Sequence, residues 1–400
     1  MFKGEIALKG DKSITHRVIM MSSINKKITR IINPSNCIDV FSTISVLNQC
    51  GALFDYNTGD IIINKLLNHN PYHVLNCGNS GTTARLLIGL LFGQGYSAII
   101  DGDDSLRSRP MDRVLDPLAL MNLKYESKNK KLPIKIHSSI VAPVNHTLVV
   151  PSAQVKSSII LATFGYKNNC RIIDKFKTRD HTERMIKHFQ SNKISLSDYV
   201  VPGDISNAAF LIGAAVCIND SNFSVKDVLF NKTRNGLINT LIKMNANISI
   251  SNIRKLQNEE ICDINVKYSP NLISYNIDND ELVSMIDEIP IYAIISCFVK
   301  GKTTLINAPE LRLKESDRIS ELCVHLSSAN INIIESDNGF EIKPERNMYN
   351  TIKIESKDHR IIMACEIFNL IISGKCSSMF LEEVSISFPD FYSCIEKLMQ

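Results

Sequence analysis

The 400-residue sequence lacks several features that would assign it to a common functional class. It has no Cys-x-x-Cys pair, which argues against a structural zinc site. Its longest apolar segment, residues 289–299, contains Pro290 and is too short to cross a bilayer, and residues 1–12 lack the apolar core of a signal peptide. No glycine-rich linker, low-complexity segment or long basic run is present. The net charge of +4 is too small to indicate general binding of nucleic acid or membranes.

What is present is the composition of a soluble globular protein, with 44% apolar and 22% charged residues. A chain of this length can hold two domains, each with its own core. The 11 cysteines are scattered singly through apolar runs, which indicates reduced, buried thiols and hence a cytoplasmic protein. His69 and His73 are close in sequence, but Pro71 between them argues against a metal site on a shared helical face.

Helical runs alternate with short strand-like runs along the chain. Apolar residues recur at helical spacing, or nearly continuously, in residues 18–23, 84–91, 157–163, 208–216, 319–326 and 361–371. Between them lie Ile-, Val- and Leu-rich stretches bounded by turn residues, such as residues 97–100. This alternation predicts an α/β or α+β fold. The spacing is too irregular for a short-repeat solenoid but suits several β-α-β-α-β-β units.

Six short polar clusters stand at or just before the start of these apolar runs. The clusters are residues 12–17, 79–85, 152–156, 203–206, 314–318 and 358–360. A helix start offers unpaired backbone N–H groups and a partial positive charge, so cationic side chains placed there make an anion site. One such start is ordinary capping, whereas six in one chain indicate a cavity that holds a strongly negative ligand.

The first two clusters each have a functional and a structural interpretation. Ser13 and Arg17 share a helical face, with Lys12 at the entry, and a point charge, a hydroxyl and a planar guanidinium suit a phosphate. A Ser N-cap followed by a solvated Arg explains the same residues. Gly81, with Arg85 one turn later, lets backbone pass close to a ligand or merely begins a capped helix. No Gly-Lys-Ser/Thr follows, which argues against a P-loop.

Two further segments are equally open. Arg107 and Arg109, followed by Pro110, are typical of a loop that presents a guanidinium, and also of a surface arginine pair. Asp287 and Glu288 precede the long apolar segment, as a candidate base or as a helix cap.

The cluster 314–318 is dense in charge. If it is helical, Lys314 and Arg318 lie on one side with Glu315 close to both. A carboxyl group among cations can serve as a general acid. A solvated, salt-bridged face is the alternative.

The order of these clusters and the residues within them closely resemble those of the 5-enolpyruvylshikimate-3-phosphate synthase family over essentially the whole chain. The matching strings are residues 10–17, 78–82, 106–111, 152–157, 179–184, 201–206, 313–318, 358–361 and 387–389. The resemblance implies transfer of the enolpyruvyl group of phosphoenolpyruvate to the 5-hydroxyl of shikimate 3-phosphate, with release of phosphate, in aromatic amino-acid biosynthesis. It also implies a tetrahedral intermediate and no metal ion or organic cofactor.

The resemblance further implies a role for each matching residue. Those implied to bind shikimate 3-phosphate are Lys12, Ser13, Arg17, Ser152, Ala153, Gln154, Thr178, Asp287 and Lys314. Those implied to bind phosphoenolpyruvate are Lys12, Gly81, Arg109, Gln154, Arg318 and Arg360. Catalytic roles are implied for Asp287, which orients or deprotonates the 5-hydroxyl, for Glu315, which protonates the methylene carbon, and for Lys12.

The implied architecture is two similar α/β domains, each of three βαβαββ units, with helices inside, sheets outside and a cleft between the domains. Residues 1–10 and 203–400 form one domain, and residues 11–202 form the other. Substrate binding in the family closes the domains over the cleft. The family also implies a cytoplasmic monomer with no nucleic-acid or membrane partner.

Three features depart from the family pattern. Ile386 occupies a position where many members carry a Lys that touches phosphoenolpyruvate, and Glu310 stands where some have an Asn facing the shikimate phosphate. No Trp is present. Because Gly81 is retained where glyphosate-tolerant members often have Ala, we expect glyphosate to inhibit in competition with phosphoenolpyruvate.

Two other functions fit part of the pattern. The sister transferase that acts on UDP-N-acetylglucosamine shares the fold, but its entry motif carries Lys-Asn where this chain has Lys12 and Ser13. It also commonly uses a loop Cys, and none lies between Cys77 and Cys170. A ligand-binding regulator could keep the fold without turnover, but binding alone needs no acid–base pair such as Asp287 and Glu315.

Overall fold

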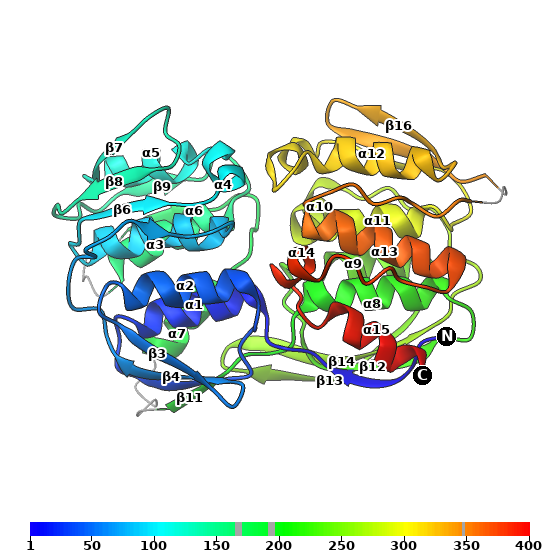
Figure 1. Cartoon of the computed structure of the whole chain (residues 1–400), viewed down its shortest axis with the longest axis horizontal. Helices are drawn as coiled ribbons and strands as arrows, with labels where there is room; N and C mark the ends of the chain where they lie inside the picture. Colours follow the sequence, from blue (N-terminus) through cyan, green and yellow to red (C-terminus); the bar gives the residue numbers. More distant parts are fainter. Residues whose placement is uncertain (165–169, 191–196, 346–348) are drawn as a thin grey trace. The chain divides into compact units, whose positions relative to one another are not determined.

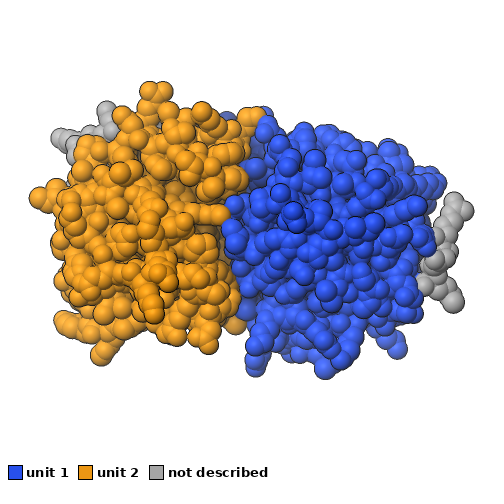
Figure 2. All heavy atoms as spheres, turned by 90° about the horizontal axis from the view of Figure 1, so that it is seen from above, with its two compact units in different colours: residues 1–9, 202–400 blue, residues 10–201 orange. Residues whose placement is uncertain are grey.

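The structure, a computed structural model, describes residues 1–164, 170–190, 197–345 and 349–400. The chain forms two compact units (Figure 1, Figure 2). Unit 1 comprises Met1–Lys9 and Pro202–Gln400, and unit 2 comprises Gly10–Val201. The boundaries expected from the sequence, after residues 10 and 202, fall beside these. The first strand of the chain is therefore separated from the rest of its unit by the whole of the other unit.

Unit 2 contains helices and strands in alternation. Its elements are α1 (Lys12–Ser22), β2 (Ile28–Ile32), α2 (Ile38–Asn48), β3 (Leu53–Asn57), β4 (Asp60–Lys65), β5 (Leu75–Asn76), α3 (Gly81–Gly93), β6 (Ala98–Asp101), α4 (Asp104–Ser108), α5 (Asp112–Leu120), β7 (Lys124–Ser127), β8 (Ile134–His137), β9 (Asn145–Thr147), α6 (Ala153–Thr163), β10 (Arg171–Ile173), α7 (His181–Gln190) and β11 (Ser197–Val200).

Two sheets of unit 2 share one topology. Their strand orders are β11-β2-β4-β3 and β5-β6-β8-β7. In each, the first two strands are parallel and the last two form an antiparallel hairpin. A parallel pair needs a long crossover, which α3 supplies between β5 and β6, whereas a hairpin needs only a short turn. Within the described residues, the third sheet consists of the parallel pair β9 and β10, which α6 connects.

Unit 1 begins with the N-terminal strand and continues after unit 2. Its elements are β1 (Lys3–Ala7), α8 (Ile205–Cys217), β12 (Asn222–Leu229), α9 (Gly236–Lys243), β13 (Asn247–Leu256), β14 (Glu259–Lys267), α10 (Asn279–Met285), α11 (Ile289–Ser296), β15 (Thr303–Leu305), the 3₁₀ turn η1 (Pro309–Leu313), α12 (Arg318–Ser328), β16 (Asn332–Ser336), β17 (Gly339–Lys343), α13 (His359–Ser373), α14 (Leu381–Ser385) and α15 (Phe391–Met399).

The sheets of unit 1 repeat the same pattern less completely. The order β1-β12-β14-β13 matches the four-stranded sheets of unit 2, with β1 parallel to β12 from Lys3 beside Asn222. The second sheet is three-stranded, β15-β17-β16, and a single parallel bridge between Ile273 and Lys300 stands next to it in sequence. Among the described residues after β17, no strand is present.

The predicted α/β class is confirmed, and in each unit helices lie between sheets (Figure 1). The central helices are α1, α3 and α6 in unit 2, and α8, α11 and α13 in unit 1. Helix α8 is buried from Ile205 to Val216, and every residue of α11 is buried. A helix buried on all sides must be apolar on all sides, which explains the nearly continuous apolar runs of the sequence. Helices α8, α11 and α13 pack on one another, and α3 packs on α1 and α6.

Five of the predicted polar clusters stand at the N-terminal ends of central helices, namely those of α1, α3, α6, α8 and α13. No helix in the described part of the chain is long and apolar enough to cross a membrane.

Candidate active site

The central helices that carry predicted clusters begin with side-chain caps. A backbone N–H in the first turn of α1, α3, α6, α8 and α13 donates to the side chain of the preceding residue; these cap residues are Asp11, Ser80, Ser152, Asp204 and Asp358. Such caps fix the start of a helix and stabilise it by about 1 kcal/mol each. By fixing the backbone there, they also fix the positions from which the neighbouring cationic side chains extend.

The cluster 314–318 differs from the prediction. Helix α12 begins only at Arg318, because the side chain of Asp317 accepts a hydrogen bond from Ser320 N and caps the helix there. Lys314 and Glu315 therefore lie in the turn before α12, so the helical arrangement in which Lys314 and Arg318 would share a face is not formed, although Glu315 does contact Arg318. The remaining central helix start is that of α11, directly after Asp287 and Glu288.

In unit 2, the cations at the start of α1 are held by the protein itself. Lys12 Nζ lies 2.8 Å from Asp39 Oδ2. The Arg17 guanidinium is buried and donates to Thr182 Oγ1 at 2.8 Å, to Ser157 Oγ at 2.9 Å and to the carbonyl of Ser13 at 2.9 Å. The sharing of a helical face by Ser13 and Arg17 is confirmed. Arg17 thus ties α1 to α6 and to the start of α7.

A second group surrounds the start of α3. Gln154 Oε1 accepts a hydrogen bond from Arg85 Nη1 at 3.0 Å, and Gln154 Nε2 donates to Thr82 Oγ1 at 3.0 Å. A Cβ added to Gly81 would lie 2.8 Å from Arg85 Nη1 and 3.4 Å from Arg109 Nη1. The first residue of α3 therefore faces two guanidinium groups at close range. Glycine leaves this space open.

The structure argues against one of the two interpretations of Arg109, that of a surface arginine pair. Residues 106–108 lie in the short helix α4, Arg109 follows its end, and only 6% of Arg109 is exposed. Its Nη2 donates to Asn79 Oδ1 at 2.7 Å and to Ser105 Oγ at 3.0 Å. The guanidinium is therefore held beside the Asn79–Gly81 turn.

The start of α6 and the segment before α7 form a third group. Ser152 caps α6, and Ala153 is its first residue. Thr178 is buried, and both its backbone N–H and its hydroxyl donate to Asp174 Oδ2, at 3.0 and 2.7 Å. Lys156 on α6 bridges to the same carboxylate at 2.9 Å. Burial raises the pKa of Asp174, but these contacts outweigh it and hold the pKa below its ordinary value.

In unit 1, three carboxylates converge on one buried guanidinium. Arg318 Nε donates to Asp358 Oδ2 at 2.8 Å, Arg318 Nη2 donates to Glu315 Oε2 at 2.6 Å, and Nη1 lies 3.6 Å from Asp287 Oδ1. Arg318 is 1% exposed. Burial lowers its pKa, but the carboxylates of Asp358 and Glu315 raise it above the ordinary value, so the group stays charged. Its Nη1 makes no hydrogen bond within the described residues, which leaves one buried donor for an acceptor.

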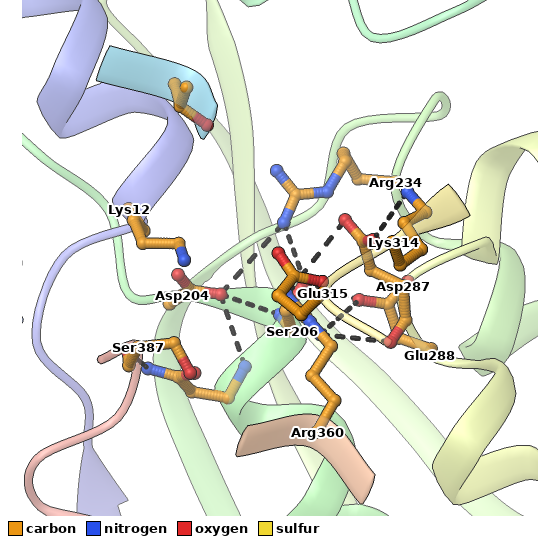
Figure 3. A network of polar contacts seen from close by, with 12 residues as sticks. Lys12, Asp204, Ser206, Arg234, Asp287, Glu288, Lys314, Glu315, Arg360 and Ser387 are labelled. Atoms are coloured by element: carbon orange, nitrogen blue, oxygen red, sulfur yellow. Dashed lines mark hydrogen bonds and ion pairs between the residues drawn. The ribbon is translucent and has the colours of Figure 1, made fainter. Parts of the chain in front are cut away.

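Asp287 is also held by two further cations (Figure 3). Lys314 Nζ donates to Asp287 Oδ1 at 3.2 Å, and Arg360 Nη1 donates to the Asp287 carbonyl at 3.0 Å. Arg360 Nη2 lies 4.0 Å from Asp287 Oδ2. The structure thus brings together Asp287, Lys314 and Arg360 with the Glu315–Arg318 pair, all within unit 1.

The variant positions lie in short elements of unit 1. Ile386 directly follows α14 and is half-buried, and Glu310 lies in η1.

Sequence reasoning missed Arg234, which is 2% exposed and donates through Nη2 to Ser206 Oγ at 2.9 Å. A signal was available, because Arg234 stands in a polar turn before an apolar helix, as the other clusters do. Among the described residues, no group of three or more His, Cys, Asp or Glu is placed to hold a metal ion.

Comparisons with known proteins agree with one another. The family profile described as EPSP synthase (3-phosphoshikimate 1-carboxyvinyltransferase) matches residues 1–395. The 3-phosphoshikimate 1-carboxyvinyltransferase of Thermodesulfovibrio yellowstonii is 37% identical over 100% of this chain and 97% of its own length. That of Petrotoga mobilis is 39% identical over 98% of this chain and 96% of its own.

Solved structures give the same answer. The EPSP synthase of Acinetobacter baumannii superposes with a TM-score of 0.85 at 31% identity, covering 99% of this chain and 96% of that one. The enolpyruvyl transferase NikO from Streptomyces tendae reaches a TM-score of 0.72 at 12% identity, over 99% of this chain and 95% of that one, which shows a shared fold alone. With a profile match over nearly all its length and relatives well above 30% identity, the chain belongs to the EPSP synthase (3-phosphoshikimate 1-carboxyvinyltransferase) family.

Proposed function

We propose that this protein is a 3-phosphoshikimate 1-carboxyvinyltransferase, which transfers the enolpyruvyl group of phosphoenolpyruvate to the 5-hydroxyl of shikimate 3-phosphate and releases phosphate. Family membership supports the activity. The observation that carries the residue assignment is the Arg318 guanidinium, which contacts both Asp287 and Glu315 and whose buried Nη1 makes no hydrogen bond among the described residues. A carboxylate pair beside a buried cation can exchange protons with a bound anion.

Addition comes first in the proposed reaction. Asp287 accepts the proton of the 5-hydroxyl while the oxygen of that hydroxyl forms a bond to C2 of phosphoenolpyruvate. Glu315 gives a proton to the methylene carbon, which becomes a methyl group. Lys314, which donates to Asp287, also hydrogen-bonds the shikimate. In the elimination, the Glu315 carboxylate takes a proton back from that methyl group as the C2–O bond to phosphate breaks and phosphate leaves. General acid–base catalysis of this kind contributes about 10²–10⁴-fold in rate.

The remaining assigned residues bind and position. In unit 2, Lys12, Ser13, Arg17, Ser152, Ala153, Gln154 and Thr178 contact shikimate 3-phosphate, and Lys12, Gly81, Arg109 and Gln154 contact phosphoenolpyruvate. In unit 1, Arg318 and Arg360 bind the phosphate and carboxylate of phosphoenolpyruvate. Charge-assisted hydrogen bonds contribute about 1.5–3 kcal/mol each, so several to one phosphate suffice for micromolar binding after the entropy of association is lost.

Two assignments require a rearrangement of the contacts described. Both donors of Thr178 point at Asp174, so its hydroxyl must exchange that carboxylate for a phosphate oxygen. The Arg17 guanidinium already donates to three protein oxygens. A substrate phosphate must therefore take over one of these contacts or share its donor.

We further propose that the enzyme is a monomer of the cytoplasm. All 11 cysteines are free thiols, the form that a reducing compartment maintains. Most are strongly buried, and burial raises the pKa of the Cys37 thiol to about 11. Size-exclusion chromatography with light scattering tests the monomer.

The activity is tested by phosphate release from the purified protein. Shikimate 3-phosphate and phosphoenolpyruvate together should yield one enolpyruvyl ether for each phosphate, and neither alone should yield phosphate. A parallel reaction replaces shikimate 3-phosphate with UDP-N-acetylglucosamine. Turnover only in that reaction would identify the sister activity, and binding of both substrates without phosphate release would identify a regulator.

A further inference from the structure

The start of α11 differs from the starts of the other central helices. Glu288 occupies the N-cap position, but its side chain makes no hydrogen bond to the first turn of α11, a helix that the structure describes in full. Only 2% of Glu288 is exposed. Burying a carboxylate is costly unless it is paired or hydrogen-bonded, so its contacts must lie elsewhere.

Those contacts are to the two neighbouring central helices (Figure 3). Glu288 Oε1 accepts a hydrogen bond from the hydroxyl of Ser206, near the start of α8. The same oxygen lies 3.8 Å from Nη1 of Arg360, near the start of α13. Ser206 Oγ in turn accepts from Arg234 Nη2 at 2.9 Å. One carboxylate therefore joins the starts of α8, α11 and α13.

Arg360 contacts two consecutive residues, Asp287 and Glu288. Its Nη1 donates to the carbonyl of Asp287 at 3.0 Å and faces the carboxylate of Glu288 at 3.8 Å. A guanidinium is planar, and its donors keep fixed directions, so contacts on one nitrogen restrict the whole plane. Glu288 Oε2 is buried without a hydrogen-bond partner among the described residues, so Ser206 and Arg360 supply the compensation for its charge.

We propose that Glu288 is a positioning residue of the phosphoenolpyruvate site. By contacting Ser206 on one side and Arg360 on the other, it fixes the orientation in which Arg360 meets the substrate. The inference rests on the proposed function, in which Arg360 binds phosphoenolpyruvate. It adds a residue that acts through another residue and does not itself contact the substrate.

A positioning role and a simple charge effect predict opposite changes in the KM for phosphoenolpyruvate when the charge of Glu288 is removed. If Glu288 acted only through its negative charge, removing that charge beside Arg360 would strengthen the binding of an anion, because a repulsion is lost. If Glu288 holds Arg360 in place, removing the charge weakens binding, because the guanidinium is free to turn away. The change in KM for phosphoenolpyruvate separates the two.

The decisive variant is Glu288→Gln, which keeps the shape of the side chain and an oxygen for Ser206 but loses the ion pair. We expect KM for phosphoenolpyruvate to rise about tenfold or more, since small misplacements of a binding group have effects of that size. KM for shikimate 3-phosphate and the melting temperature should stay near their wild-type values. Glu288→Asp, which restores the charge on a shorter side chain, should lie between Gln and wild type.

Ser206→Ala is a second test of the positioning role, because it removes the hydroxyl group that donates to the Glu288 carboxylate and orients it. Its effect on KM for phosphoenolpyruvate should have the same direction, and the double variant should show less than the product of the two effects, since both act through Glu288. Glu341→Gln is the matched control, because Glu341 on β17 pairs with the exposed Lys302 at 2.9 Å.

Each outcome has a defined meaning. An unchanged or lowered KM for phosphoenolpyruvate in Glu288→Gln overturns the inference. So does an equal rise of KM for both substrates with a lower melting temperature, which indicates a purely structural role. If the wild-type protein itself releases no phosphate, the proposed function fails; direct titration of Glu288→Gln with phosphoenolpyruvate by calorimetry then still tests the positioning of Arg360.

Discussion

Arg318 and Asp358 form a doubly hydrogen-bonded ion pair that is sealed from solvent. Arg318 Nε donates to Asp358 Oδ2 at 2.8 Å, and Nη2 donates to Oδ1 at 3.2 Å. The two side chains are 1% and 0% exposed. The pair holds the start of α12 against the start of α13, and it fixes the guanidinium that also contacts Glu315. Its integrity therefore controls both the stability of unit 1 and the proposed site.

We expect Asp358→Asn to destabilise the protein by about 3–5 kcal/mol at pH 7, because it leaves the buried Arg318 without its main partner. Burial raises the pKa of Asp358, but Arg318 outweighs it and holds that pKa below its ordinary value. The ionised pair therefore stabilises the fold above the unfolded pKa of about 3.9, and this stabilisation is lost as the pH falls through the lower folded pKa. Urea unfolding at several pH values measures the difference.

The difference in stability between wild type and Asp358→Asn should thus be constant from pH 7 down to about pH 4 and shrink below it. Asp104→Asn is the control and should change little, because Asp104 is fully exposed and pairs with Arg107 at the surface. A difference that disappears already near neutral pH would contradict the assignment.

The acid–base roles predict large losses in turnover. Asp287→Asn and Glu315→Gln keep the size of the side chains but cannot exchange the proton, so kcat should fall about 10²–10⁴-fold for each. KM should change less than kcat. Steady-state phosphate release measures both, and circular dichroism checks the fold. If kcat stays near the wild-type value in either variant, its proposed role is wrong.

Gly81→Ala should reduce sensitivity to glyphosate. The added Cβ would lie 2.8 Å from Arg85 Nη1 and 3.4 Å from Arg109 Nη1, so the guanidinium groups that face the start of α3 must shift. Because the atoms displaced are the ends of flexible side chains, we expect little loss of stability. Wild type should show inhibition competed by phosphoenolpyruvate, and the variant a higher inhibition constant together with a higher KM for phosphoenolpyruvate. Wild type that resists millimolar glyphosate would refute the first part.

Lys156→Met should destabilise unit 2. Lys156 is buried and bridges Asp174 at 2.9 Å and Glu183 at 2.7 Å, and its Nζ also donates to the carbonyl of Thr178 at 3.3 Å. Removing one partner of a buried pair costs about 3–5 kcal/mol, which urea unfolding measures. KM for shikimate 3-phosphate should also rise, because Thr178 loses its support.

The double variant Lys156→Met with Asp174→Asn should recover part of the stability, since one of the two carboxylates that lose Lys156 is then neutral, while Glu183 stays charged. Full additivity of the two single losses would show that the residues act independently. Lys302→Met, at an exposed pair, is the control.

Local sequence was sufficient to predict where the helices start, but not which residues from other parts of the chain contact those starts. The caps at Ser80 and Asp204, and the apolar runs behind them, follow from residue types within one or two turns. The position of Lys314 and Glu315 before α12 was not predicted, because charge spacing alone does not reveal that Asp317 caps the helix that begins at Arg318. The start of α11 was recognised only as a carboxylate pair.

What the sequence by itself determined is the α/β class, the buried central helices and the polar clusters at their starts, because capping, apolar periodicity and turn residues act over short distances along the chain. Only the tertiary structure decided which charges meet. Strand β1 pairs with β12, Arg17 meets Thr182, and Arg318 meets Asp358 across long stretches of chain. Such pairs form because burying a charge requires a partner, and the packing of the helices, rather than their local sequence, determines which partner is within reach.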